Sequence, residues 1–234
     1  MTAFDELYEV MSIIKKEDNA DCKPPIPLFS FEGLPGAGKT TQIKRVVEAL
    51  QGKYGKAFYI DLPTQSPIGK MMRMLYSDLD KWKIIRREMP WLNVVAISAD
   101  LRMTMAEAVK KGAQYAVMSR GILSTYYYNL DAYSNEDDVA WEKMECDMKA
   151  FYCPTAILFL DIDEKTAHDR VVHRNRGPLR EMDHIEKMKE DKKRMMEYLT
   201  KLDNVPVFHV NGLGSEEQVT EEIARCIEGI LQGK

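Results

Sequence analysis

Short apolar runs separated by longer amphipathic stretches give this chain of 234 residues its repeating pattern. A continuous apolar run of about four to eight residues, bounded by turn residues, is typical of a strand buried on both faces. Five such runs predict strands at residues 26–31, 57–60, 115–118, 155–160 and 205–210. Because these runs alternate with stretches long enough for helices, we expect an α/β fold with a five-stranded parallel sheet and helices on both faces.

The stretches between the runs carry apolar residues three and four positions apart, which predicts helices. The predicted helices cover residues 39–52, 66–76, 91–111, 134–151 and 163–175, with a further one around 126–128 and a last one that begins at Ser215. Gly52 is expected to close the first of them, and Ser66-Pro67 to cap the second. Gly177-Pro178 interrupts the pattern, and a strongly charged helix follows it to about Leu202. Residues 77–90 are expected to form a surface connection or a short helix.

Residues 1–26 are predicted to be an N-terminal extension, and residues 27–234 the main domain. An amphipathic stretch over residues 1–16 predicts an extra helix, and the prolines between Asp18 and Pro27 predict a linker that is not helical. This division puts the sheet, and any site at its edge, in the second part.

Charge and cysteine usage narrow the class of protein. The net charge is -4, which gives no overall reason to expect nucleic-acid binding. The longest apolar run, from Ala156 to Leu160, is too short to cross a membrane, and we expect no membrane partner. The four cysteines show no C-x-x-C pair, which indicates reduced thiols and a cytoplasmic protein.

One loop carries a complete chemical motif. Residues 33–40 read GLPGAGKT, which matches the phosphate-binding P-loop between a predicted strand and a predicted helix. Glycines allow backbone N–H groups to approach phosphate oxygens, and the helix start adds positive charge. Lys39 would reach the β- and γ-phosphates of ATP, and the Thr40 hydroxyl would ligate Mg²⁺. The expected contacts of the phosphate donor are Gly33, Pro35, Gly36, Ala37, Gly38, Lys39, Thr40 and Thr41. The plain alternative is a glycine-rich turn that binds nothing.

Four arginines surround the Gly177-Pro178 break, and they are Arg170, Arg174, Arg176 and Arg180. Arginines on a segment that closes over a migrating phosphoryl group could stabilise its charge and exclude water. We therefore predict a lid at about residues 170–182, with Arg174 and Arg176 as catalytic groups. The alternative is a solvated surface on which Glu181, Asp183 and Glu186 pair with these arginines.

With these motifs in place, the sequence resembles the thymidylate kinase family of P-loop nucleoside monophosphate kinases over about residues 27–232. The similar segments are FEGLPGAGKTTQ at 31–42, PTQSPIG at 63–69, SADLR at 98–102, SR followed by the stretch to Asn129 at 119–129, and LDID at 160–163 followed by the lid arginines. The resemblance implies the P-loop NTPase fold, ATP with Mg²⁺ as phosphate donor, a deoxynucleoside monophosphate as acceptor, a place in nucleotide biosynthesis and often a homodimer.

The resemblance also implies roles for individual residues. Arg120 matches the arginine that holds the acceptor phosphate, and Arg170 the one that stacks on the donor adenine. Asn129 falls where the family has a glutamine that reads the pyrimidine edge. Arg102 approximates the arginine that contacts the base.

Four positions depart from the family's pattern. Ser119 replaces an aspartate that is the outer-shell partner of Mg²⁺, and Asp61 replaces an arginine beside the acceptor. Ile97 replaces the aromatic residue that stacks on the base, and Gly121 replaces a tyrosine. These changes fall in one pocket, so thymidylate is only the default acceptor.

Two other functions stay open at this point. A deoxynucleoside kinase would use a similar sheet and P-loop, with Asp61 as the base that takes the hydroxyl proton. An aspartate at the end of a strand can equally cap the next turn. A nucleotide-binding protein without transfer activity is the third alternative, favoured by Ser119.

Overall fold

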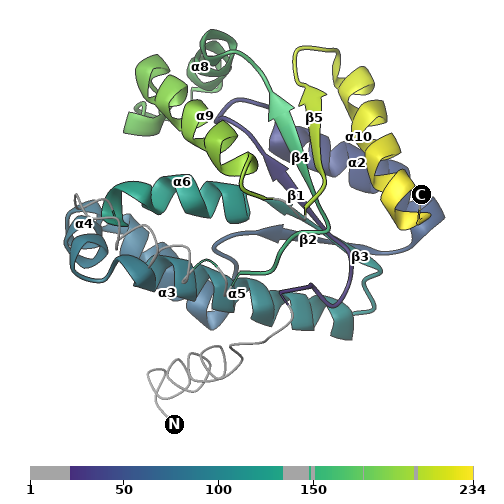
Figure 1. Ribbon diagram of the computed structural model, residues 1–234, viewed down its shortest axis with the longest axis horizontal. Helices are drawn as coiled ribbons and strands as arrows, with labels where there is room; N and C mark the ends of the chain where they lie inside the picture. Colours follow the sequence, from purple (N-terminus) through teal and green to yellow (C-terminus); the bar gives the residue numbers. More distant parts are fainter. Residues whose placement is uncertain (1–21, 134–147, 149–150, 176, 203–204, 234) are drawn as a thin grey trace.

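The computed structural model describes residues 22–133, 148, 151–175, 177–202 and 205–233. In this part of the chain a five-stranded sheet lies between two layers of helices (Figure 1). The helix predicted at residues 1–16 and most of the helix predicted at 134–151 lie outside the described residues.

All strands of the sheet are parallel, as the sequence predicts. They are β1 (Leu28–Glu32), β2 (Ala57–Asp61), β3 (Tyr115–Ser119), β4 (Ala156–Asp161) and β5 (Val207–Asn211). Their order is β2-β3-β1-β4-β5, so the strand that leads into the P-loop is the central one. Every residue of β1 and β3 is buried, which explains why their sequences are runs of apolar residues rather than alternations.

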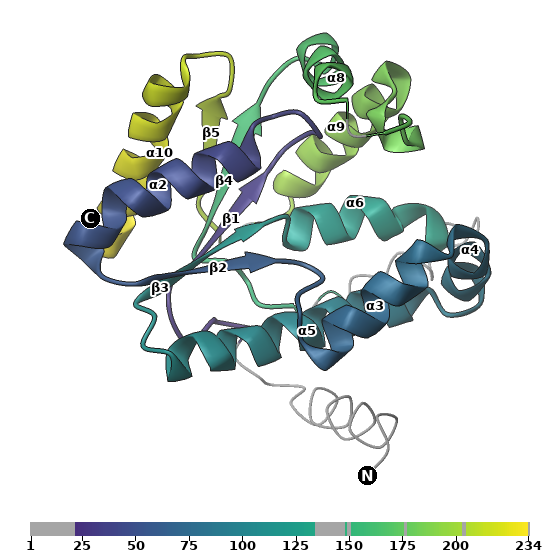
Figure 2. The ribbon, with the colours of Figure 1, turned by 180° about the vertical axis from the view of Figure 1, so that it is seen from behind.

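The helices that follow the strands cover both faces of the sheet (Figure 2). On one face lie α2 (Lys39–Tyr54) and α10 (Glu216–Leu231), which pack against each other. The opposite side carries α3 (Pro67–Ser77), α4 (Leu79–Glu88), α5 (Pro90–Lys110), α6 (Ile122–Tyr133) and α9 (Ile185–Leu199), with α8 (Glu164–His173) beside α9. This layering confirms the α/β class of the P-loop NTPase fold.

Several predicted ends of helices are confirmed by their caps. The Ser66 hydroxyl accepts a hydrogen bond from the Gly69 N–H at 3.0 Å and caps α3, with Pro67 in the first turn. Ser215 and Gln218 form the reciprocal capping box at the start of α10.

Two predicted boundaries are wrong. The first helix continues past Gly52 to Tyr54, because Gly55, with φ 78°, is the residue in the left-handed region that ends it. The strongly charged helix does not follow Gly177-Pro178 directly, since the short 3₁₀ turn η1 (Glu181–Asp183) precedes α9. The ambiguous stretch 77–90 contains the regular helix α4, capped by the side chain of Asp78.

Within the described ranges, every helix is either too short or too polar to span a lipid bilayer.

Candidate functional site

The P-loop adopts backbone angles that glycine reaches without strain and other residues do not. Gly33, Gly36 and Gly38 have φ values of 129°, 88° and 96°, in the region that disfavours other residues. A Cβ atom on Gly36 would also lie 2.3 Å from the carbonyl oxygen of Ala167 on α8. The loop therefore packs closely against α8, and α2 begins at Lys39 with its positive end facing the loop.

Lys39 folds back into the loop. Its Nζ donates to the carbonyl oxygens of Gly33 at 2.6 Å and Leu34 at 2.8 Å, and the residue is buried. Burial is the main cause that lowers the pKa of Lys39 to about 7; Arg120 and Arg174 lower it further, and Glu32 opposes them. The Nζ group is thus held against two backbone carbonyl oxygens of the loop.

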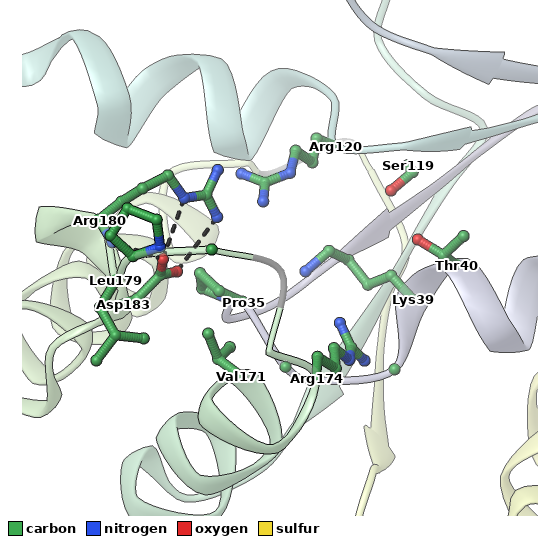
Figure 3. Close-up of a pocket in the computed structure, with 14 residues that line it drawn as sticks. Pro35, Lys39, Thr40, Ser119, Arg120, Val171, Arg174, Leu179, Arg180 and Asp183 are labelled. Atoms are coloured by element: carbon green, nitrogen blue, oxygen red, sulfur yellow. Dashed lines mark hydrogen bonds and ion pairs between the residues drawn. The ribbon is translucent and has the colours of Figure 1, made fainter.

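A cavity of about 410 Å³ opens in front of the loop (Figure 3). Its walls come from three segments: the P-loop, the end of β3, and the segment that follows α8. The polar and charged residues that line this phosphate cavity are Lys39, Thr40, Ser119, Arg120, Arg174, Arg180 and Asp183. The structure therefore brings together the P-loop, Arg120 and two of the four predicted lid arginines.

Arg120 stands in an unusual backbone conformation at the end of β3. Its φ is 72°, in the left-handed region that non-glycine residues rarely occupy. The guanidinium lies 5.4 Å from the centre of the Tyr128 ring and donates a hydrogen bond to the Tyr128 hydroxyl. The Tyr128 hydroxyl is the main cause that raises the pKa of Arg120, so this side chain is a permanent cation.

Glu32 is a part of the site that the sequence reasoning missed. It is the last residue of β1, it is fully buried, and its carboxylate accepts three hydrogen bonds. The donors are the Ser30 hydroxyl at 3.0 Å, the Gly121 N–H at 2.7 Å and the Ser124 hydroxyl at 2.6 Å. The available signal was a charged residue at the end of an otherwise apolar strand, directly before the P-loop.

The lack of a side chain at Gly121 has a steric explanation. A Cβ atom at this position would lie 2.5 Å from the Ser30 hydroxyl oxygen and 2.3 Å from the end of the Met118 side chain. Any side chain at this position, including the tyrosine of the family pattern, would require these two neighbours to move.

The segment after α8 carries the two lid arginines of the cavity. Arg174 is the exposed C-cap of α8, and the chain then turns through Asn175 and Gly177, with φ of 43° and 109°. Arg176 lies outside the described residues. Figure 3 shows Arg174 on the same side of the cavity as Lys39 and Arg180 on the opposite wall.

Asp183 holds Arg180 in place. The Asp183 carboxylate accepts from the Arg180 backbone N–H at 3.0 Å, from Nε at 3.1 Å and from Nη2 at 3.2 Å. Burial raises the pKa of Asp183, but the hydrogen bonds and charge of Arg180 outweigh it, and the pKa lies below its ordinary value. The sequence left open a solvated surface on which Asp183 pairs with a lid arginine. The pair is present, but both of its residues line the phosphate cavity.

Three residues predicted from the resemblance lie elsewhere. Arg170 donates from Nη2 to the carbonyl oxygen of Gly212 at 3.2 Å, at the end of β5. The Arg102 guanidinium lies 4.3 Å from the centre of the Tyr152 ring. Asn129 is fully buried; its amide oxygen accepts from Asn93 at 2.8 Å and its amide nitrogen donates to the Thr125 carbonyl at 2.6 Å.

Asp61 is exposed and lines a second depression of about 740 Å³ beside the edge strand β2. Its backbone carbonyl accepts from Nη2 of Arg73 at 3.3 Å. The helix that follows is capped by Ser66. The two roles considered for Asp61, general base and cap of the turn after β2, both stay predictions. The turn is held by Asp100, a fully buried carboxylate that accepts hydrogen bonds from the Thr64 N–H and the Ser66 hydroxyl.

The donor set of the cavity is compatible with Mg²⁺ bound mainly through substrate. In Figure 3 the hydroxyl groups of Thr40 and Ser119 point toward each other beside Lys39. Oxygen donors of this kind suit Mg²⁺, which usually takes few protein ligands and completes its shell with phosphates and water. Among the described residues there is no cluster of three or more His, Cys, Asp or Glu side chains that could hold a metal ion by themselves.

Comparisons with known proteins place the fold and the cavity in a wider context. A family model described as thymidylate kinase matches residues 31–223. The chain is similar to a probable thymidylate kinase of Archaeoglobus fulgidus, with 26% identity over 209 residues, covering 88% of this chain and 97% of that protein. It is also similar to a thymidylate kinase of Desulfotalea psychrophila, with 27% identity over 89% of this chain and 97% of that protein. A probable thymidylate kinase of Pyrococcus horikoshii is 29% identical over 87% of this chain and 96% of its own length.

Proposed function

The chain belongs to the thymidylate kinase family, and we propose that it transfers the γ-phosphate of ATP to a deoxynucleoside monophosphate, with thymidylate as the default acceptor. Membership makes it a phosphotransferase, an ATP-dependent nucleoside monophosphate kinase of nucleotide biosynthesis. One observation carries the assignment of the site: the P-loop, Arg120 and two lid arginines line a single cavity.

The P-loop is the proposed donor site. The polyphosphate of ATP would lie against the loop, with its oxygens accepting backbone N–H groups and the Lys39 ammonium at the β- and γ-phosphates. Lys39 is already buried in the loop, and phosphate oxygens would take the place of the two carbonyl oxygens that its Nζ now contacts. Gly33, Pro35, Gly36, Ala37, Gly38, Thr40 and Thr41 complete this proposed donor site.

Arg120 is the proposed anchor of the acceptor. A monophosphate arrives with about two negative charges and must lie next to the γ-phosphate of ATP. A fixed cation is needed between the two, and Arg120 supplies planar donors at the end of the strand beside the P-loop strand. Supported in this way, an oxygen of the acceptor phosphate attacks the γ-phosphorus as the bond to ADP breaks.

Arg174, Arg176 and Arg180 are proposed to act from a lid at about residues 170–182. Charge spreads over the equatorial oxygens of the migrating phosphoryl group, and guanidinium groups brought near it lower the barrier. Arg170 would contact the donor adenine from the same segment. Hydrogen exchange with and without a bisubstrate analogue tests closure, and equal protection in both states would count against it.

Mg²⁺ would be held by Thr40 together with the phosphates of ATP, where it neutralises charge on the β- and γ-oxygens. Ser119 offers a hydroxyl in place of the expected aspartate, and its neighbourhood to Thr40 supports a role in orienting water around the ion.

For the base of the acceptor, Asp61, Arg102 and Asn129 are the proposed contacts. The buried hydrogen-bond chain from Asn93 through Asn129 to Thr125 means that Asn129 must exchange a partner to read a base directly.

The two other functions are not favoured. Asp61 lies in a separate depression from Lys39 and Arg120, so a nucleoside kinase with Asp61 as base has less support from the geometry. A protein that binds nucleotide without transfer is not favoured either, because the family and the relatives that the chain matches are kinases.

Three further proposals concern the whole chain. We propose a boundary near residue 27 between the N-terminal extension and the kinase domain, and assembly into a homodimer, which light scattering would test. A cytoplasmic location is supported by the free thiols of Cys22, Cys153 and Cys226, and cell fractionation would test it.

Release of ADP with a panel of deoxynucleoside monophosphates and nucleosides tests the proposed function. We expect turnover with a monophosphate and none with the matching nucleoside, and loss of turnover in Lys39→Ala. Better turnover with nucleosides, or ADP release that persists in folded Lys39→Ala protein, would overturn the proposal.

A further inference from the structure

We propose that Glu32 is a positioning residue for phosphoryl transfer, which holds Arg120 in the place where it meets the acceptor phosphate. The inference rests on the proposed function of Arg120 and assigns a task to a buried carboxylate that the transfer chemistry does not itself use.

Hydrogen bonds to Phe31 and Glu32, at the end of β1, fix the backbone turn that contains Arg120. The backbone N–H of Arg120 donates to the Phe31 carbonyl at 3.1 Å, and the next N–H, that of Gly121, donates to the Glu32 carboxylate at 2.7 Å. The two peptide groups that flank the Arg120 side chain are therefore both bonded to the end of β1. This pairing holds a φ of 72° that a residue with a side chain would otherwise leave.

A second hydrogen bond links Glu32 to α6. The Ser124 hydroxyl donates to the other Glu32 oxygen at 2.6 Å, so one carboxylate joins the end of β1 to the first turn of α6. The same helix carries Tyr128, whose hydroxyl accepts from Arg120. Glu32 thus fixes the backbone next to Arg120 and also the first turn of α6, the helix whose Tyr128 bonds the Arg120 guanidinium.

A carboxylate suits this arrangement because every hydrogen bond that the Glu32 side chain makes here is one that it accepts. Three donors converge on Glu32, and an ionised carboxylate is an acceptor at both oxygens. A glutamine keeps one acceptor oxygen for Gly121, and the Ser124 hydroxyl would then have to accept from its amide group instead of donating. The negative charge also favours the charged forms of Lys39 and Arg120, since Glu32 raises the pKa of both.

A residue that merely stabilised the joint between β1 and α6 would lower stability and weaken all ligands alike. A residue that acts through Arg120 affects only ligands that carry the acceptor phosphate. Binding of thymidine monophosphate compared with thymidine, by calorimetry, separates the two roles. The comparison uses the full chain without ATP, and Asp191→Asn serves as matched control because Asp191 is a buried carboxylate outside the cavity.

We expect Glu32→Gln to weaken thymidine monophosphate binding about tenfold, the size of one charge-assisted hydrogen bond, and thymidine binding less than about threefold. Asp191→Asn should leave the ratio of the two affinities unchanged. Ser124→Ala removes one donor and should shift the ratio in the same direction by about two- to fivefold. If Glu32→Gln does not fold, Ser124→Ala decides, and an unchanged ratio in that variant overturns the inference.

A double variant that combines Glu32→Gln with Arg120→Ala tests whether Glu32 affects binding through Arg120. If Glu32 acts through Arg120, the double variant binds thymidine monophosphate no more weakly than Arg120→Ala alone. Effects that multiply, or a Glu32→Gln variant that loses both ligands equally, would overturn the inference. If Arg120→Ala itself binds thymidine monophosphate normally, the proposed function of Arg120 is what fails.

Discussion

Arg180 and Asp183 form a two-point ion pair on the wall of the phosphate cavity, with Nε to Oδ2 at 3.1 Å and Nη2 to Oδ1 at 3.2 Å. The two partners differ in exposure: the side chain of Arg180 is 62% exposed and that of Asp183 only 5%. The backbone carbonyl of Asp183 also lies 2.7 Å from Nδ1 of His168 on α8. Asp183 therefore connects Arg180 to α8, the helix on which the lid begins.

Asp183→Asn should lower kcat about tenfold and leave the KM for ATP within about twofold. Asparagine keeps the shape but loses the charge that orients Arg180, and a cation needed mainly in the transition state affects kcat. Steady-state kinetics with ATP and thymidine monophosphate measure both constants. Glu181→Gln, which changes the exposed carboxylate two positions earlier, is the control and should behave like the wild type. A rise in KM with unchanged kcat would show that Arg180 serves ground-state binding instead.

ATP binding should take up protons at about pH 8 through Lys39. The pKa of Lys39 is about 7 in the protein without nucleotide, so above that pH most molecules carry a neutral amine. Phosphate charge favours the ammonium, so binding raises this pKa and draws a proton from the buffer. Calorimetry in buffers of different ionisation enthalpy measures the uptake. Lys39→Met should bind more weakly without taking up the proton, and equal uptake in both proteins would contradict the assignment.

Arg120→Ala should cost about 1.5–3 kcal/mol or more in kcat/KM, the range for a hydrogen bond to a charged group. Asp61→Asn should cost less than about tenfold, well below the loss of a general base. Both variants are assayed with thymidine monophosphate and thymidine, and then with the other common bases. The opposite order of effects, with thymidine as the better acceptor, would make Asp61 the base and the acceptor a nucleoside.

Gly121→Ala should destabilise the fold by about 1–3 kcal/mol, the usual cost of overpacking a close contact. The added methyl group would meet the Ser30 hydroxyl at 2.5 Å, and Ser30 is fixed in the central strand. Gly52→Ala is the matched control, since Gly52 lies inside α2 with open space around its Cα. There we expect a gain of about 0.5–1 kcal/mol from helix propensity. Urea denaturation followed by circular dichroism compares the two variants with the wild type, and a neutral Gly121→Ala would show that the contact relaxes freely.

The fold could be read from the chain because the five strands are apolar runs with clear boundaries. The P-loop could also be predicted, because the residues that form it are consecutive in the sequence. Arg120 was placed correctly beside the P-loop because strands in a parallel sheet end at one edge.

Local sequence patterns could not identify side-chain contacts between elements that are far apart in the sequence. Glu32 contacts Ser124, and Arg120 contacts Tyr128 from a helix whose start the sequence left vague. The roles inferred for Asn129 and Arg102 came from position in a family pattern. In the structure these side chains have partners, Asn93 and Tyr152, that no spacing rule identifies. Boundaries such as that at Gly52 failed because glycine can occupy a helix when its backbone angles allow it.

The central position of β1 has a consequence for biosynthesis on the ribosome. Leu28 pairs with Ala116 and Phe29 with Ala156, so the first strand to be made waits for partners that emerge much later. Until then an apolar strand with two open edges is attached to a P-loop that lacks Arg120 and the lid. The nascent chain therefore cannot complete the phosphate cavity before β3 and the lid have been made, and β1 keeps unpaired edges until β3 and β4 follow.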